Sequence, residues 1–291
     1  MRIYGVDFTC APRRAKPITI ASGLLARSML RVEEIQELGS FVDFEAFLQR
    51  PGPWLGGFDF PFSLPHELVR DLAWPAAWSA LVAHCAGLSR LELRAALDAY
   101  RGTRSPGSKY VHRATDIPAG SSSPMKLVNP PVALMFHEGA PRLAAADVCL
   151  PGLRPSASSR VALEAYPGLL ARKQLGIRAS YKSDTRSEHT PARRQARAQI
   201  VRALKRGQPL GIVLGWAKRL ETQVLEDGTG DLLDAVICAV QAAWAWRKRR
   251  ANYGLPADAP VGEGWIVTAK APARDGSPST PCRSARAGSL P

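Results

Sequence analysis

Alternation of apolar and polar residues predicts five β-strands, and three of them lie close together at the start of the chain. The first covers residues 2–7, and two more candidates follow at 16–24 and 29–38 after short polar gaps. Short gaps of this kind favour an antiparallel meander. A fourth strand is predicted at 54–60 and a fifth at 160–165.

A helix is predicted between the third and fourth strands. Ser40 is placed to cap it, Asp43 follows three residues later in the capping-box position, and Pro51 ends it. Because a helical crossover joins parallel strands, we expect the fourth strand to lie beside the first and parallel to it.

A helical and loop insertion is predicted at about residues 65–150, between the fourth and fifth strands. Its first part, 65–101, reads as two helices with a second capping box that begins at Ser89. A weaker helix is predicted at 132–146. The Gly-, Ser- and Pro-rich segment 102–126 is interpreted either as an ordered loop facing a substrate or as a mobile surface loop.

The last part of the chain is basic and helical. In the basic run 180–207, Pro191 suits the first turn of a helix that either contacts phosphate or presents a solvated face. The last strong helix is predicted at 231–250. We therefore expect an α/β fold with a five-stranded mixed sheet, three antiparallel strands plus two parallel ones, flanked by helices. The domain is expected to cover 1–268, and 269–291 to form a disordered basic tail.

The composition describes a large and strongly basic chain. It has 291 residues, of which 46% are hydrophobic, enough for one large domain with a substantial core. The net charge of +14 is expected to attract polyanions, nucleic acid first, although solubility alone also accounts for such a charge. No apolar run can span a bilayer, the start lacks a secretory signature, and the five cysteines lack zinc-site spacing. We expect a cytoplasmic protein with reduced thiols and no membrane association.

Candidate chemistry begins with two aspartates that end the first and fourth strands. Asp7 and Asp59 occur in similar text, GVDF and GFDF, with Gly5 or Gly57 two residues earlier on the same strand face. If these strands are parallel neighbours, the carboxylates meet at the edge where open α/β sheets bind ligands. Glycine at these positions lets another backbone or a helix end approach the carboxylates. The alternative for Asp7 is that it only caps the turn before Pro12.

Three further acids complete a possible cluster. Glu164 ends the fifth strand, and Asp231 and Asp234 share one face of the first turn of the last helix. Capping and the helix dipole also account for the helix pair. A set of carboxylates without cysteine or histidine suits hard cations such as Mg²⁺ or Mn²⁺. Two such ions about 4 Å apart can activate a water and stabilise the leaving oxygen of a phosphodiester.

The order of elements, with an acid on the first strand, near the end of the fourth and on a late helix, resembles the ribonuclease H-like superfamily. The pair Asp231-x-x-Asp234 looks like the arrangement in RuvC-type Holliday-junction resolvases. The chain more closely resembles the family of domains of unknown function numbered 429, which are predicted nucleases of ribonuclease H-like fold. This resemblance runs from Met1 to about Trp265. It is carried by GVDFTCAP, GFDFPFSLP, EAYP, the Tyr181-Lys182 pair and DLLDAVICAVQA.

The resemblance implies metal-dependent hydrolysis of phosphodiester bonds in DNA or RNA. The implied ligands of Mg²⁺ or Mn²⁺ are Asp7, Asp59, Asp231 and Asp234. Glu164, in the EAYP text, joins the catalytic set. Lys182 either contacts the scissile phosphate or is a surface lysine, and we expect Arg113 and Asp116 to pair beside the site.

Two other functions compete with a nuclease. An actin-like ATPase or phosphotransferase shares the first-strand aspartate but needs a Gly- and Thr-rich turn after it. The turn here, Thr9-Cys10-Ala11-Pro12, has no glycine. A non-catalytic nucleic-acid-binding protein would bind in a salt-sensitive way without needing metal.

Overall fold

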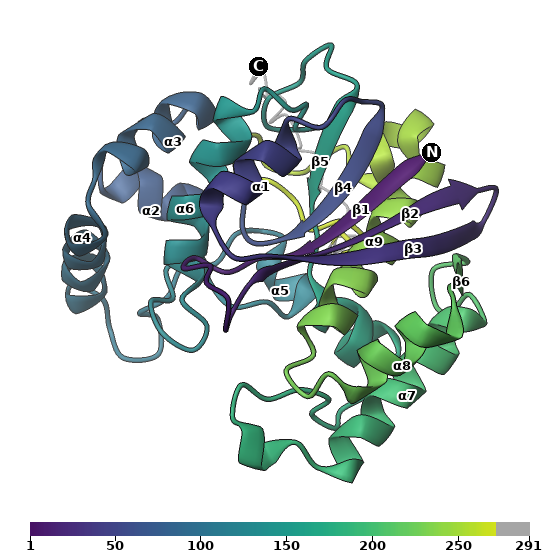
Figure 1. Ribbon diagram of the computed structural model, residues 1–291. Coiled ribbons are helices and arrows are strands. Elements are labelled where there is room, and N and C mark those ends of the chain that lie inside the picture. Colours follow the sequence, from purple (N-terminus) through teal and green to yellow (C-terminus); the bar gives the residue numbers. More distant parts are fainter. Residues whose placement is uncertain (272–291) are drawn as a thin grey trace, which may run out of the picture.

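One mixed sheet runs through the centre of the structure, a computed structural model that describes residues 1–271 (Figure 1). Its strands are β1 (Arg2–Asp7), β2 (Ile18–Ala26), β3 (Met29–Leu38), β4 (Trp54–Asp59), β5 (Arg160–Glu164) and β6 (Val213–Gly215). They lie in the order β5-β4-β1-β2-β3-β6. β2 pairs antiparallel with β1 on one side and with β3 on the other, and β4 and β5 continue the sheet parallel to β1. The predicted meander and parallel crossover are therefore confirmed.

The strand count of five is wrong, because β6 adds a sixth strand at the far edge. It has 3 residues and pairs in parallel with the start of β3, where the backbone N–H of Val213 donates to the carbonyl of Ser28 at 2.8 Å. A strand this short contains too little alternation to be recognised in sequence. The predicted tail at 269–291 lies, from residue 272 onward, outside the described residues.

The helices are α1 (Phe41–Leu48), α2 (His66–Asp71), α3 (Trp78–Gly87), α4 (Arg90–Gly102), α5 (Asp116–Ala119), α6 (Val132–Ala145), α7 (Pro191–Lys205), α8 (Lys218–Glu226) and α9 (Asp231–Arg247). A π-helical turn covers Leu169–Gln174 and a short 3-10 turn Arg249–Gly254. Ser40 and Ser89 each accept a hydrogen bond from a backbone N–H in the first turn of the helix that they precede, as predicted, and Thr190 does the same ahead of α7.

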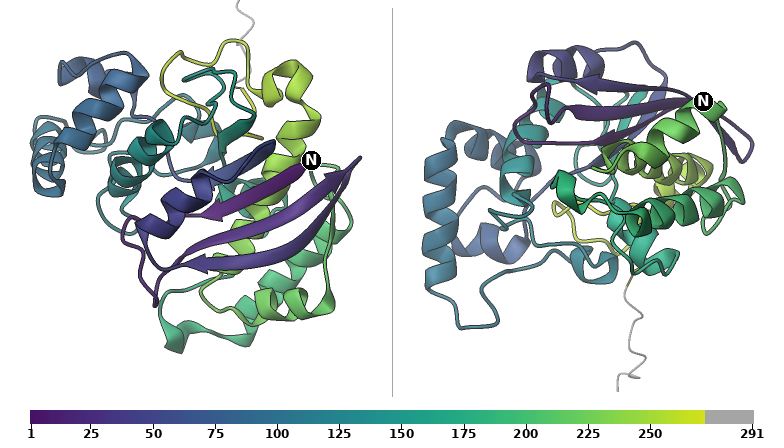
Figure 2. Two further views of the ribbon diagram at one scale, coloured as in Figure 1. Left: turned by 45° about the horizontal axis from the view of Figure 1, so that its top comes forward. Right: turned by 60° about the horizontal axis from the view of Figure 1, so that its bottom comes forward.

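The insertion departs from the prediction, since three helices, α2, α3 and α4, replace the two that were expected. Pro75 lies between α2 and α3, and Ala73 adopts a positive φ of 52° there. Both features interrupt a helix. These helices stand at one side of the molecule, away from the sheet (Figure 2). Among the described residues, no helix is both long and apolar enough to cross a membrane.

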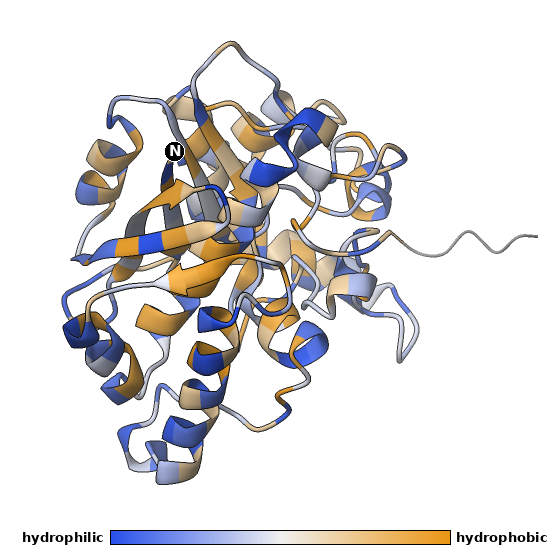
Figure 3. Ribbon diagram, turned by 90° about the vertical axis from the view of Figure 1, so that its right-hand side faces the viewer, coloured by the Kyte–Doolittle hydropathy of each residue, from blue (hydrophilic) through white to orange (hydrophobic). Residues whose placement is uncertain are grey.

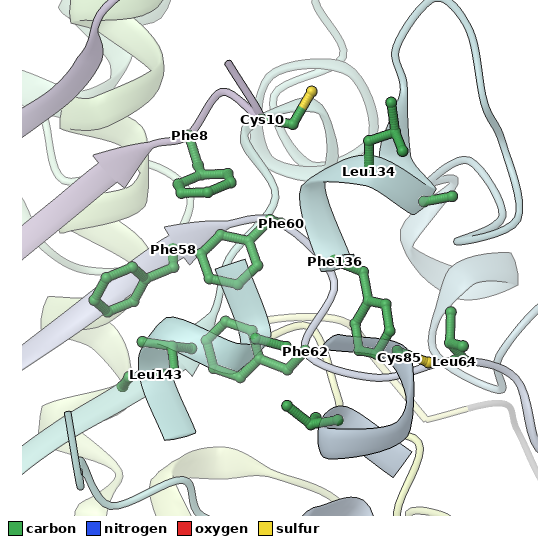
Figure 4. Packing of buried hydrophobic residues seen from close by; sticks show 14 of the residues in the cluster. Phe8, Cys10, Phe58, Phe60, Phe62, Leu64, Cys85, Leu134, Phe136 and Leu143 are labelled. Carbon is green, nitrogen blue, oxygen red and sulfur yellow. The ribbon is translucent and has the colours of Figure 1, made fainter. Parts of the chain in front are cut away.

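Two hydrophobic layers sandwich the sheet. Alternate residues of β1 face opposite sides, so that Tyr4 and Val6 belong to the cluster with α1 while Ile3 belongs to the cluster with α9. The two helices lie on opposite faces of the sheet (Figure 2). Apolar residues gather where the sheet meets its helices, and hydrophilic ones lie on the outer helices (Figure 3). On the α1 side, the aromatic rings of β4 and the segment after it meet α6 (Figure 4); Phe8, Phe58, Phe60, Phe62 and Phe136 belong to this cluster.

α9 lies directly against the strand backbones at two glycines. A Cβ atom built on Gly5 would lie 2.0 Å from the carbonyl oxygen of Ala235 and 2.1 Å from the backbone nitrogen of Ala239. One built on Gly57 would lie 2.6 Å from the carbonyl oxygen of Cys238. The expectation that these glycines admit a helix backbone close to the strand acids is confirmed, and the first turn of α9 is held beside the ends of β1 and β4.

Candidate active site

Asp7 and Asp59 are direct partners in the parallel register of β1 and β4. Both are half-buried at the ends of their strands. Burial raises the pKa of Asp7 well above its usual range, and the facing carboxylates of Asp231 and Asp234 raise it further. Burial and the carboxylate of Asp234 raise the pKa of Asp59 to about 7. Asp7 is therefore affected by both acids of α9, and Asp59 is affected by Asp234.

The first turn of α9 supplies the other two acids. Gly230, with φ of 80°, forms the turn before the helix, and its carbonyl accepts the backbone N–H of Asp234 at 2.9 Å. Asp234 is fully buried; it accepts a hydrogen bond from the Tyr181 hydroxyl at 2.6 Å and another from the Lys182 ammonium. Asp231 is 8% exposed. Asp7, Asp59, Asp231 and Asp234 thus form one group, the acid cluster.

Two lysines partly neutralise the acid cluster. The Nζ atom of Lys16 lies 3.3 Å from an oxygen of Asp231 and 2.6 Å from one of Asp184. Burial lowers the pKa of Lys182, but Asp234, Tyr181 and Asp7 together raise it well above its usual range, so the ammonium stays charged. If all four carboxyls were ionised, the two ammonium groups would leave two negative charges unbalanced, and one bound divalent cation would balance them. Without a cation, the raised pKa values of Asp7 and Asp59 mean that these two carboxyls take up protons more readily than usual.

The acid cluster suits a hard cation by its chemistry, since every candidate donor is a carboxylate oxygen. Asp7 and Asp59 have no side-chain hydrogen-bond or ion-pair partner within residues 1–271. In the same range, no three His, Cys, Asp or Glu side chains are already gathered closely enough to hold a metal ion. Two of the four carboxylates are engaged by lysine instead.

Glu164 lies beside the acid cluster but is held by a different partner. Its two carboxylate oxygens accept hydrogen bonds from Arg113 at 2.6 and 2.7 Å, and one also accepts the backbone N–H of Phe62 at 3.1 Å. Arg113 pairs with Asp116 at 2.9 Å as well, which confirms the expected pair. All three charged side chains are buried. This triad fixes the loop before α5 against the end of β5, and its cation balances Glu164 from within the protein.

Removing the arginine of the triad is expected to be strongly destabilising. Arg113→Ala leaves the carboxylates of Glu164 and Asp116 buried without a cation, which costs about 3–5 kcal/mol of unfolding free energy. Chemical denaturation measures this loss. Arg2→Ala, which removes the exposed ion pair with Glu33, serves as the control and should cost less than about 1 kcal/mol. Equal losses in the two variants would contradict the assigned role of the triad.

A pocket of about 660 Å³ opens over the acid cluster. Asp7, Asp59 and Asp231 line it, as do Lys16 and Lys182, whereas Asp234 lies beneath the lining. Part of the pocket wall comes from the segment 102–126, including Arg113, Ser121 and Lys126. The sequence alone leaves open two interpretations of this segment, an ordered loop facing a substrate and a mobile surface loop.

Sequence reasoning missed three residues of the pocket: Lys16, Tyr166 and Arg172. Lys16 lies in the turn between β1 and β2. Its place in a turn at the carboxyl end of the first strand, close to Asp7, is the signal that could have identified it. Tyr166 belongs to the EAYP text, where only the glutamate attracted attention. Burial and the carboxylate of Asp59 raise the pKa of Tyr166. Arg172 offers no signal, because it lies in a π-helical turn that no pattern predicts.

The sheet and the pocket define the class: an α/β protein that presents clustered carboxylates at the carboxyl edge of parallel strands. The model of the family described as "Protein of unknown function (DUF429)" matches residues 5–260, and the chain belongs to this family. No curated protein and no solved structure gives a significant match.

Proposed function

We propose that this protein is a metal-dependent nuclease of ribonuclease H-like fold, which hydrolyses phosphodiester bonds of DNA or RNA. The observation that carries the proposal is the convergence of Asp7, Asp59 and Asp231, from β1, β4 and α9, on the lining of one pocket, with Asp234 beneath it. The strand arrangement also supports it, since three antiparallel strands are followed by two parallel ones, with acids at the ends of β1 and β4.

The pocket side of the acid cluster would hold the metal. Asp7, Asp59 and Asp231 would bind Mg²⁺ or Mn²⁺, which supplies an activated water and charge stabilisation for the leaving oxygen. Asp234 has a different position, because it accepts the Lys182 ammonium and the Tyr181 hydroxyl below the lining. It therefore holds Lys182 at the pocket, where a compact cation is suited to a phosphate oxygen.

Two cations at the pocket would contact the nucleic-acid backbone. Lys126 and Arg172 line the pocket, and neither has an ion-pair partner in the described part of the chain. Because neither is paired with a carboxylate in that part of the chain, each is free to replace a counterion on phosphate. The proposed substrate therefore meets positive side chains on the wall of the pocket and carboxylates on its floor.

Removing either cation is expected to weaken binding without regard to sequence. Lys126→Ala and Arg172→Ala should each reduce the slope of log affinity against log salt by about 1. Fluorescence anisotropy with a labelled oligonucleotide between 50 and 200 mM salt, roughly, gives this slope. Arg194→Ala is the control, since Arg194 is paired with Glu226 at 2.6 Å and lies outside the pocket. A salt slope that changes only in the control would overturn the assignment of these cations.

The test of the function is cleavage of labelled DNA and RNA, single-stranded and duplex, with Mg²⁺, with Mn²⁺ and with a chelator. We expect cleavage with either metal and none with the chelator. Without metal, the clustered carboxylates of a nuclease would repel the polyanion, so the chelator should also weaken binding. Binding that is tight, salt-sensitive and unaffected by the chelator, without cleavage of any substrate, would instead support the non-catalytic alternative.

A further inference from the structure

The pocket has a second surface that metal binding and phosphate contact do not use, an apolar wall at the start of α6. It consists of Pro130, Pro131, Val132 and Met135. Val132 and Met135 are three residues apart on α6 and both half-buried, so they share the face that lines the pocket. Leu134 and Phe136 on the same helix are instead buried members of the hydrophobic core (Figure 4).

The pocket therefore combines two kinds of lining surface, one charged and one apolar. Lys126, Arg172, Asp7, Asp59 and Asp231 provide charged groups, and the apolar wall provides a surface for apolar contact. Lys126 lies next to this wall, since its carbonyl accepts the backbone N–H of Ala133 at 2.9 Å. A volume of about 660 Å³ lies within the range of pockets that enclose small ligands, roughly 300–1,000 Å³. A base inside a duplex is paired and stacked between its neighbours, so its flat face is not available to such a wall. An unpaired nucleotide offers a phosphate and a free flat face together.

We infer that the pocket takes one unpaired nucleotide of a single strand, with its phosphate toward the acid cluster and its base against the apolar wall. The inference rests on the proposed function for the position of the phosphate. Contact between a base face and apolar side chains tolerates every base, so the pocket accepts a single strand without reading its sequence.

The first test compares two ligands that differ only by the base. Adenosine 5′-monophosphate and ribose 5-phosphate are titrated in the presence of Mn²⁺, and the shift in melting temperature gives each affinity. We expect the nucleotide to bind about tenfold more tightly than the sugar phosphate. Equal affinities would overturn the inference.

Variants of the apolar wall sharpen this test. The double substitution Val132→Ala and Met135→Ala should remove the preference for the nucleotide and leave the affinity for ribose 5-phosphate unchanged. The control is Val42→Ala with Leu91→Ala, since these side chains are 73% and 78% exposed on α1 and α4. The melting temperature without ligand shows that each variant is folded. A preference that survives in the wall variant would contradict the assignment.

A second test uses cleavage and separates this inference from the proposed function. The same labelled strand is offered alone and within a blunt duplex, with Mg²⁺. We expect kcat/KM for the single strand to exceed that for the duplex at least about tenfold. Cleavage of the duplex at an equal or higher rate would overturn the inference while supporting the nuclease. Nucleotide binding that depends on the apolar wall, with no cleavage of any substrate, would contradict the nuclease and support the nucleotide pocket.

Discussion

Asp7→Asn is expected to abolish metal-dependent cleavage, lowering kcat/KM by about three orders of magnitude. The substitution removes the carboxylate at the end of β1 from the acid cluster, where burial and the acids of α9 raise the pKa of Asp7. A lost metal ligand forfeits several kcal/mol of transition-state stabilisation, and each 1.36 kcal/mol corresponds to about tenfold in rate. Cleavage kinetics with saturating Mg²⁺ or Mn²⁺ measure the change.

The stability of the same variant separates a catalytic loss from unfolding. Without metal, Asp7→Asn relieves repulsion among buried carboxylates, so the unfolding free energy should rise by about 1–2 kcal/mol. Asp98→Asn is the matched control, because Asp98 pairs with Arg101 on exposed α4, and it should retain full activity. An Asp7→Asn protein that stays within twofold of wild-type activity, or that is inactive only because it unfolds, would contradict the assigned role.

Gly5→Val is expected to be the most destabilising single change in the sheet. Its Cβ atom alone would lie 2.0 Å from the carbonyl oxygen of Ala235, and the clash is with helix backbone, which cannot rotate away. Overpacking of a core costs about 1–3 kcal/mol, and more where backbone must move. We expect a loss of at least about 3 kcal/mol, or roughly 6–12 °C in melting temperature for a domain of this size. Thermal unfolding followed by circular dichroism measures it.

The control for this prediction is a glycine with open space around it. A Cβ atom on Gly102, at the end of α4, would meet nothing within 4 Å, so Gly102→Ala should be neutral or stabilise by up to about 1 kcal/mol. A Gly5→Val protein as stable as Gly102→Ala would show that α9 does not pack on β1 as described. Because α9 carries Asp231 and Asp234, loss of this packing should also remove the acid cluster.

Much of the frame of this site could be predicted from the sequence, because it depends on local patterns. Alternation located β1 and β4, and a helix between strands implied the parallel pairing that sets Asp7 beside Asp59. The repeated glycines indicated a close backbone approach, which α9 makes at Gly5 and Gly57. Each of these features is encoded within a few residues of where it acts.

The partners of the acids could not be predicted, because they depend on contacts between distant segments. Nothing near Asp231 in the chain indicates that Lys16 will reach it, and nothing near Glu164 indicates that Arg113 will neutralise it. A carboxylate at a strand end looks the same in sequence whether its oxygens are unpaired or are bound by a buried guanidinium. Glu164 was therefore predicted in the catalytic set, and its place in a buried ion-pair triad with Arg113 was not foreseen.

Calorimetric titration of Mn²⁺ tests the central claim most directly, namely that β1 and α9 contribute carboxylates to one cation site. Wild-type protein, Asp7→Asn, Asp231→Asn and the control Asp98→Asn are titrated under the same conditions. We predict that wild type and Asp98→Asn bind Mn²⁺ alike, and that Asp7→Asn and Asp231→Asn each lose at least about tenfold in affinity. Equal Mn²⁺ binding by all four proteins, or no binding by wild type, would contradict it.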